Sequence, residues 1–117
     1  FVFQGSNANG TSRYAHWVLP SATYAEKDGV FVNCHGRAQR IFKAFDPLKV
    51  SRPDWEILLE VGSRLKVPLA MKSPEEIFAA IGELFEPFCG LTYEKLGSIG
   101  VVLAQAGKPK KDVTHVG

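Results

Sequence analysis

The stretch that most constrains the fold runs from residue 25 to residue 39, with the sequence AEKDGVFVNCHGRAQ. A charged turn that ends at Gly29 leads into the apolar run 30–32, and a polar segment containing Gly36 separates that run from a second β-prone run. Two such runs joined by a short glycine-containing loop are typical of a β-hairpin. We therefore predict a hairpin between residues 30–32 and 38–42. Its loop would display three polar side chains, those of Asn33, His35 and Arg37.

The size and composition of the chain predict a single small domain. It has 117 residues, of which 45% are hydrophobic and 22% charged, and this composition suits a globular core. The net charge of +2 is too small and too evenly mixed to favour a nucleic-acid partner. No apolar run approaches the roughly 20 residues that a membrane span needs, so we expect no direct membrane insertion. We predict one domain over residues 1–106 and a flexible basic tail over 107–117.

Two further strands are expected near the start of the chain. Residues 1–4 are short and apolar, and residues 16–19 form a second β-prone run that Pro20 stops. Because the chain opens inside an apolar run at Phe1 rather than at a methionine, we expect it to be a piece of a longer protein.

Helical patterns dominate the second half of the chain. The first opens at residues 51–54, where Ser51 can cap the helix and Pro53 fits its first turn. Apolar residues then recur at helical spacing and are expected to form a buried stripe: Trp55, Ile57, Leu58, Leu59, Val61 and Leu65.

A second helix begins at a capping box over residues 73–76. Its expected buried face consists of Ile77, Phe78, Ile81, Leu84, Phe85 and Phe88. Residues 92–96 predict one more helical turn, and residues 99–103 a strand or packed coil. The whole pattern predicts a mixed α/β fold, with a small sheet that includes a β-hairpin and two to three C-terminal helices.

The residues themselves predict no catalytic centre and no metal site. The sequence contains no phosphate-binding loop, no dinucleotide fingerprint and no HExxH motif. Cys34 and Cys89 lie far apart without metal-ligand spacing, and we expect two reduced thiols in a cytoplasmic chain. Cys34 and His35 are adjacent, and on a strand they would point to opposite faces, so they do not form a nucleophile–base pair. Glu26 and Asp28 are expected to be solvated turn carboxylates.

Several short blocks resemble the molybdopterin oxidoreductase superfamily over about residues 1–66. The order is a strand that ends in VLP, an acidic turn, an N-x-x-G-R-x-Q segment and a helix that begins with Asp-Trp. The chain departs from the family pattern at Cys34 and His35, and it has Gln4-Gly5 where pterin-binding relatives commonly carry an acidic residue. The matching residues are Val18, Leu19, Pro20, Glu26, Gly29, Asn33, Gly36, Arg37, Gln39, Asp54 and Trp55.

Within this superfamily the blocks look most like the large iron–sulfur subunit, the G type, of NADH–quinone oxidoreductase (complex I). That resemblance implies a non-catalytic structural piece of a subunit in the peripheral arm, which takes part in respiratory electron transfer. Its partners would be the remainder of the parent subunit and other peripheral-arm subunits. Its location would be cytoplasmic, peripheral to the inner membrane. The iron–sulfur clusters would belong to the parent, and this chain would bind no cofactor.

The alternative is a molybdenum- or tungsten-dependent formate dehydrogenase-like enzyme. The resemblance then implies that this chain cradles molybdopterin guanine dinucleotide and that Arg37 offers donors to its phosphate. The cofactor-binding residues would be Asn33, Gly36, Arg37 and Gln39. A free-standing interaction module is a third possibility, and the residues alone leave open whether the chain serves an enzyme.

Overall fold

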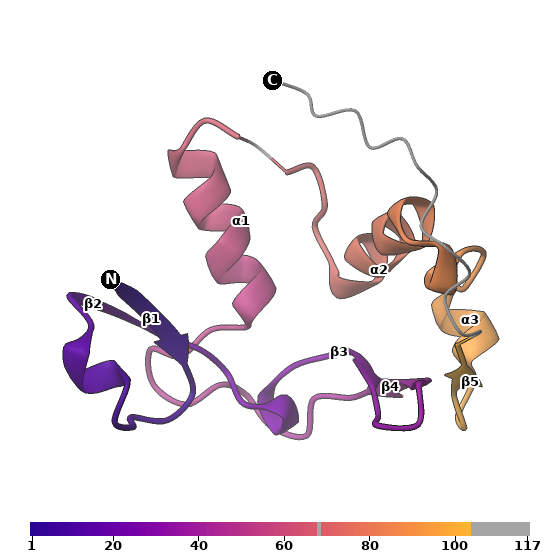
Figure 1. Cartoon of the computed structure of the whole chain (residues 1–117), viewed down its shortest axis with the longest axis horizontal. Helices are drawn as coiled ribbons and strands as arrows, with labels where there is room; N and C mark the ends of the chain where they lie inside the picture. The colour runs from indigo at the N-terminus through magenta and orange to yellow at the C-terminus, as the bar shows by residue number, and fades with distance from the viewer. Residues whose placement is uncertain (68, 104–117) are drawn as a thin grey trace. The chain divides into compact units, whose positions relative to one another are not determined.

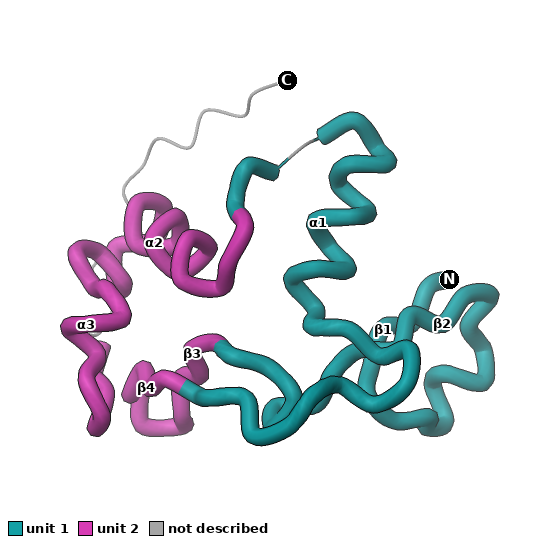
Figure 2. The backbone as a smooth tube through the Cα atoms, turned by 180° about the vertical axis from the view of Figure 1, so that it is seen from behind, with its two compact units in different colours: residues 1–28, 41–71 teal, residues 29–40, 72–117 magenta. Residues whose placement is uncertain are grey.

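The computed structural model describes residues 1–67 and 69–103, and Figure 1 labels its elements. The backbone divides into two compact units, shown in different colours in Figure 2. Unit 1 combines residues 1–28 with 41–71, and unit 2 combines residues 29–40 with those from 72 onward. The expected tail over 107–117 lies outside the described residues, and the single domain over 1–106 stays a prediction.

Unit 1 contains a pair of parallel strands, β1 (Val2–Gly5) and β2 (Trp17–Pro20). Val2 lies opposite Trp17, and Gly5 lies opposite Pro20. Both strands were predicted from their apolar runs and are confirmed to within a residue at each end. A 3₁₀ turn lies in the segment between them, Ser12–Tyr14, and a second follows β2, Tyr24–Glu26.

Helix α1 (Asp54–Arg64) completes unit 1. The helix was predicted, but the cap was wrong: Pro53 occupies the N-cap position, and the hydroxyl of Ser51 donates to the carbonyl oxygen of Leu48 at 2.7 Å. The expected buried stripe is also wrong, because only Ile57 is buried within the helix. Leu58 is 57% exposed, and Leu65, directly after the helix, is 69% exposed.

Unit 2 contains a sheet with the order β3 (Gly29–Val32), β4 (Arg37–Ile41) and β5 (Val101–Val102). The connection between β3 and β4 is too short for a parallel crossover, so these strands form the predicted hairpin. Strand β5 runs antiparallel to β4, with Val101 opposite Ala38.

Three helical segments accompany this sheet: α2 (Pro74–Leu84), the 3₁₀ turn Glu86–Phe88, and α3 (Tyr93–Leu96). Phe78 packs edge-on against Phe88, with ring centroids 6.1 Å apart, and lies 5.7 Å from the ring of Tyr93. The buried core of the unit is Ala38, Phe78, Tyr93 and Leu96. Phe78 is thus the only buried member of the face expected for α2, and Leu84 is 76% exposed. A mixed α/β fold with small sheets, a hairpin and helices is confirmed.

Helix α2 begins at Ser73, the predicted cap, but only half of the expected capping box forms, because the Glu76 carboxylate accepts from the N–H of Lys72 rather than from that of Ser73. The half that forms gives a direct test. The hydroxyl oxygen of Ser73 accepts a hydrogen bond from the backbone N–H of Glu76 at 3.2 Å. Replacing Ser73 by alanine leaves that donor unpaired, and we expect α2 to lose about 1 kcal/mol of stability against local opening. Hydrogen exchange of the α2 amides measures this loss. Ser73→Asp is the matched control, since aspartate also caps helices, and equal losses in both variants would contradict the capping role.

Candidate functional site

The hairpin loop of unit 2 is closed by the side chain of Asn33. Its Oδ1 atom accepts hydrogen bonds from the backbone N–H groups of His35, at 2.9 Å, and Arg37, at 3.0 Å. Gly36 has a φ of 73°, which favours glycine, and its N–H donates to the carbonyl oxygen of Asn33 at 2.9 Å. Two of the four candidate cofactor-binding residues therefore shape the loop.

Arg37 joins the hairpin to the segment before β5. Its Nη1 atom donates to the carbonyl oxygens of Gly100, at 3.2 Å, and Ile99, at 3.4 Å. The N–H of Leu103 donates to the carbonyl oxygen of Gly36 at 2.8 Å. Both hydrogen bonds that the Arg37 side chain makes to residues 1–67 and 69–103 use Nη1, so among these residues Nε and Nη2 of the partly exposed guanidinium are left for a further acceptor.

Gln39, the fourth candidate, lies against the backbone of Gly100. The structure therefore places all four residues in one hairpin, with Arg37 holding donors that the hairpin does not use. Their role toward a cofactor stays a prediction. The sequence reasoning missed the neighbouring Arg40, whose guanidinium carbon lies 4.3 Å from the centre of the Tyr93 ring. No sequence spacing links these two residues, because they come from β4 and α3.

Unit 1 contains a polar cluster that the sequence reasoning also missed. Asp54 accepts a hydrogen bond from Nε2 of Gln4 at 2.9 Å and forms an ion pair with Lys27. Burial alone would raise the pKa of Asp54, but the hydrogen bonds from Lys27 and Gln4 hold it below its ordinary value. Gln4 lies near the carboxyl end of β1, and such ends of parallel strands are where open α/β sheets bind ligands. The three residues lie far apart in sequence, and only the fold brings them together.

Glu26 is buried rather than solvated, so the expectation for this carboxylate was wrong. Only 2% of the residue is exposed. One carboxylate oxygen accepts from the N–H of Thr23 at 2.7 Å, and the other accepts from the N–H of Leu48 at 3.1 Å. The bond from Thr23, joined by that from Leu48, lowers the pKa of Glu26 against the opposing effect of burial. Glu26 thus holds the 3₁₀ turn after β2 to the loop before α1.

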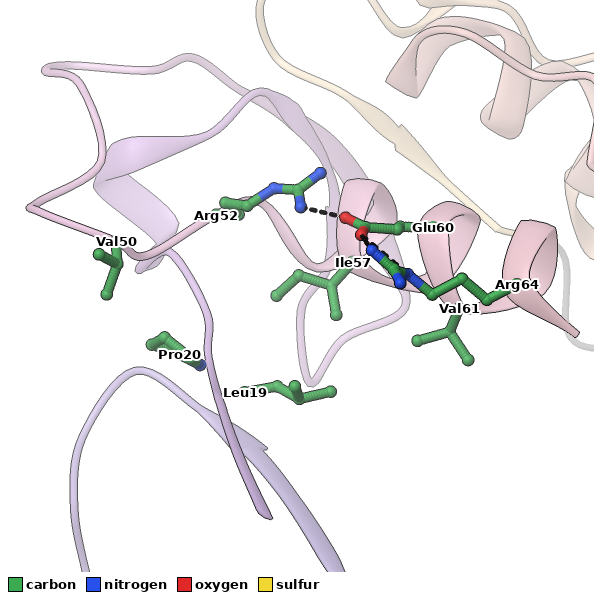
Figure 3. A pocket seen from close by; sticks show the side chains of 8 residues that line it. All are labelled: Leu19, Pro20, Val50, Arg52, Ile57, Glu60, Val61 and Arg64. Carbon is green, nitrogen blue, oxygen red and sulfur yellow. Dashed lines mark hydrogen bonds and ion pairs between the residues drawn. The ribbon is translucent and has the colours of Figure 1, made fainter.

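A cavity of about 330 Å³ also lies in unit 1, and Figure 3 shows its lining. Its apolar part includes Leu19 and Ile57, and its charged part is an ion cluster in which Arg52 and Arg64 both bond to Glu60. The two arginines lower the pKa of Glu60, so this carboxylate is ionised and its oxygens are already engaged. The cavity offers an apolar surface with paired charges rather than acid–base chemistry.

The described part of the chain shows no group of three or more histidine, cysteine, aspartate or glutamate side chains that is arranged to hold a metal ion. Cys34 and Cys89 are free and exposed. None of the helices found in residues 1–67 and 69–103 is long and apolar enough to cross a membrane.

Comparison with known proteins gives both a family and named relatives. The model of the family described as molybdopterin oxidoreductase matches residues 1–64. "Probable oxidoreductase YjgC" of Bacillus subtilis (strain 168) is 36% identical over 96 residues, which is 82% of this chain and 10% of that protein. A "Putative formate dehydrogenase" of Staphylococcus haemolyticus (strain JCSC1435) is 43% identical over 95 residues, which is 81% of this chain and 10% of that protein. Its counterpart in Staphylococcus aureus (strain USA300) is 38% identical over the same shares.

These findings support the resemblance to the molybdopterin oxidoreductase superfamily. The chain spans about a tenth of the length of the curated relatives that it matches. Two of these three relatives are named as formate dehydrogenases, and none of the three is named as a subunit of complex I. The match of the family model to residues 1–64, more than half of the sequence, shows that the chain belongs to the molybdopterin oxidoreductase family.

Proposed function

We propose that this chain is part of a formate dehydrogenase-like oxidoreductase that depends on molybdopterin, and that it serves as framework beside the cofactor. The observation that carries this proposal is the identity of 38–43% to proteins named as formate dehydrogenases over 95 residues. That similarity extends beyond the 64 residues matched by the family model, so it includes residues of the second half of the chain. The partner that we propose is the remainder of the parent subunit.

The hairpin fits a role at the edge of a cofactor site. When bound, the molybdenum cofactor supplies the redox centre of such an enzyme, and this chain would supply contacts to it. Arg37 is the residue suited to an anionic group, because its Nε and Nη2 atoms are not used by the bonds to residues 99 and 100. Asn33 and Gly36 would then act by holding the backbone of Arg37 in place.

The test of the proposed function uses the full-length protein that contains this chain. We expect the protein, purified without oxygen, to contain molybdenum or tungsten by mass spectrometry and a fluorescent pterin after oxidation. We also expect it to reduce a viologen dye with formate as the electron donor. Reduction of a quinone by NADH in a protein without pterin would overturn the proposal in favour of a complex I subunit.

A variant of Arg37 tests the contribution of this chain. In the full-length protein, we expect Arg37→Ala to lower the amount of retained pterin on the order of tenfold, because a charged donor to the anionic cofactor is lost. Arg37→Lys should retain an intermediate amount, since lysine keeps the charge but loses the planar fork. Arg13→Ala, an exposed arginine of unit 1, is the control. Unchanged pterin content in Arg37→Ala would assign Arg37 to the hairpin alone.

A further inference from the structure

Arg37 uses one nitrogen of its guanidinium to reach the backbone before β5. Its Nη1 atom donates to the carbonyl oxygens of Ile99, at 3.4 Å, and Gly100, at 3.2 Å. Nη1 carries two hydrogens, one for each of these carbonyls. Within the part of the chain that the structure describes, the donors on Nε and Nη2 remain, and these two nitrogens form the edge that can bind two oxygens of one oxyanion. The two carbonyls therefore select which edge of Arg37 is presented.

These carbonyls belong to the turn that follows α3, residues 97–100. The N–H of Gly97 donates to the carbonyl of Glu94 at 3.1 Å, and the N–H of Gly100 donates to that of Leu96 at 2.9 Å. Leu96 is a member of the buried core of unit 2, so the turn is anchored there. Gly97 and Gly100 have φ values of 55° and 75°, a backbone conformation that favours glycine. The path of the turn therefore depends on these two glycines.

Gly100 also lets the turn approach β4 closely. A Cβ atom at this position would overlap the carbonyl oxygen of Ala38, which is fully buried. Ala38 lies opposite Val101, and Arg37 lies opposite Val102. The strand that carries the guanidinium and the turn that supplies its acceptors are therefore held together by an approach that only glycine allows.

We propose that Gly100 is a positioning residue for Arg37. By keeping the carbonyls of residues 99 and 100 against Nη1, it leaves the edge formed by Nε and Nη2 to bind two oxygens of one phosphate group of the molybdopterin cofactor. This inference rests on the proposed function, because it requires a bound cofactor. It goes beyond the family match, which ends at residue 64 and assigns nothing to this turn.

A double-mutant cycle in the full-length protein tests the proposal, with retained pterin as the measurement. We expect Gly100→Ala to lower the retained pterin at least about threefold, because the guanidinium keeps its charge but loses the bonds that orient it. Combined with Arg37→Ala, the same substitution should lower it by a factor of less than about 1.5, because no guanidinium is left to orient. Two effects that multiply independently would overturn the proposal, since Gly100 would then act through the fold alone.

A milder variant and a matched control keep this test decisive if Gly100→Ala does not fold. Gly97→Ala adds backbone strain without overlap, because nothing lies within 4 Å of the added Cβ atom. Its effect on retained pterin should also require Arg37, and an effect that persists with Arg37→Ala would overturn the proposal. Gly90 has a φ of 72° and only Nζ of Lys95 nearby, so Gly90→Ala is the control. Its effect should be the same with and without Arg37→Ala, and dependence on Arg37 as strong as that of Gly100→Ala would overturn the proposal.

The cycle separates this inference from the proposed function. A wild-type protein without pterin would overturn the proposed function, and the positioning role with it. A wild-type protein that retains pterin, but in which Gly100→Ala acts equally with and without Arg37→Ala, would overturn the positioning role alone.

Discussion

Replacing Gly100 by alanine is expected to break the contact between β4 and the segment that leads into β5. Gly100 has a φ of 75°, and an added Cβ atom would overlap the carbonyl oxygen of Ala38 and the side chain of Gln39. Ala38 is fully buried, so its backbone has no room to withdraw. Backbone strain and overlap act together, and we expect a loss of at least about 3 kcal/mol in the free energy of local opening.

Alanine substitutions at two other glycines of unit 2 separate the cost of backbone strain from the cost of the Cβ overlap. Gly36 has a φ of 73° but open space around its missing Cβ, so Gly36→Ala should cost only the backbone strain, about 1–2 kcal/mol. Gly29 has open space and no positive φ, so Gly29→Ala should change the stability by less than about 1 kcal/mol.

Exchange of the amides of Asn33 and Leu103 reports all three variants, because both amides donate within the hairpin and its contact with the strand segment. The expected order of cost is Gly100→Ala, then Gly36→Ala, then Gly29→Ala. If Gly100→Ala lowers the free energy of local opening no more than Gly36→Ala does, then the close approach of Ala38 to residue 100 contributes nothing to the cost of the substitution.

Most local features were predicted correctly from the sequence, apart from the helix cap expected at Ser51, whereas long-range contacts were not predicted. The hairpin, the strands β1 and β2 and the cap of α2 each depend on neighbours within a few residues, and each was predicted. The buried stripe of α1 was not found, because helical periodicity says which face is apolar but not whether the covering element belongs to the same chain. Leu58 and Leu65, two members of the expected stripe, are exposed.

The candidate sites show the same division. Asn33 and Arg37 could be selected because they fall in one short block, although their bonds to the loop and to residues 99–100 required the structure. The cluster of Gln4, Lys27 and Asp54 joins three separate parts of unit 1. The sequence around each of these residues does not predict its contact with the other two. The glutamate at position 26 belonged to a charged turn, and such turns are usually solvated, which is why its burial was missed.

Replacing Glu26 by glutamine is expected to loosen the loop before α1. A glutamine side chain has one acceptor oxygen, so either the N–H of Thr23 or that of Leu48 would face an amide NH₂ group and lose its bond. We expect the bond from Leu48 to be the one lost, because at 3.1 Å it is longer than the 2.7 Å bond from Thr23. Because the site is buried, water does not replace the lost acceptor, and the Leu48 amide should exchange on the order of tenfold faster. Glu75→Gln, at an exposed glutamate of α2, is the control and should leave this amide unchanged.

The protection of the Leu48 amide against exchange should also depend on pH, because it depends on the charge of Glu26. The bonds to Glu26 lower its pKa in the folded chain below the ordinary value of 4.5. A lowered carboxyl pKa contributes stability that is present above the unfolded value and is lost as the pH falls through the folded value. After correction for the intrinsic exchange rate, protection of Leu48 should therefore decrease with acid below pH 4.5 in the native chain and change less in Glu26→Gln. Parallel acid profiles in the two proteins would show that the charge on Glu26 does not hold this loop.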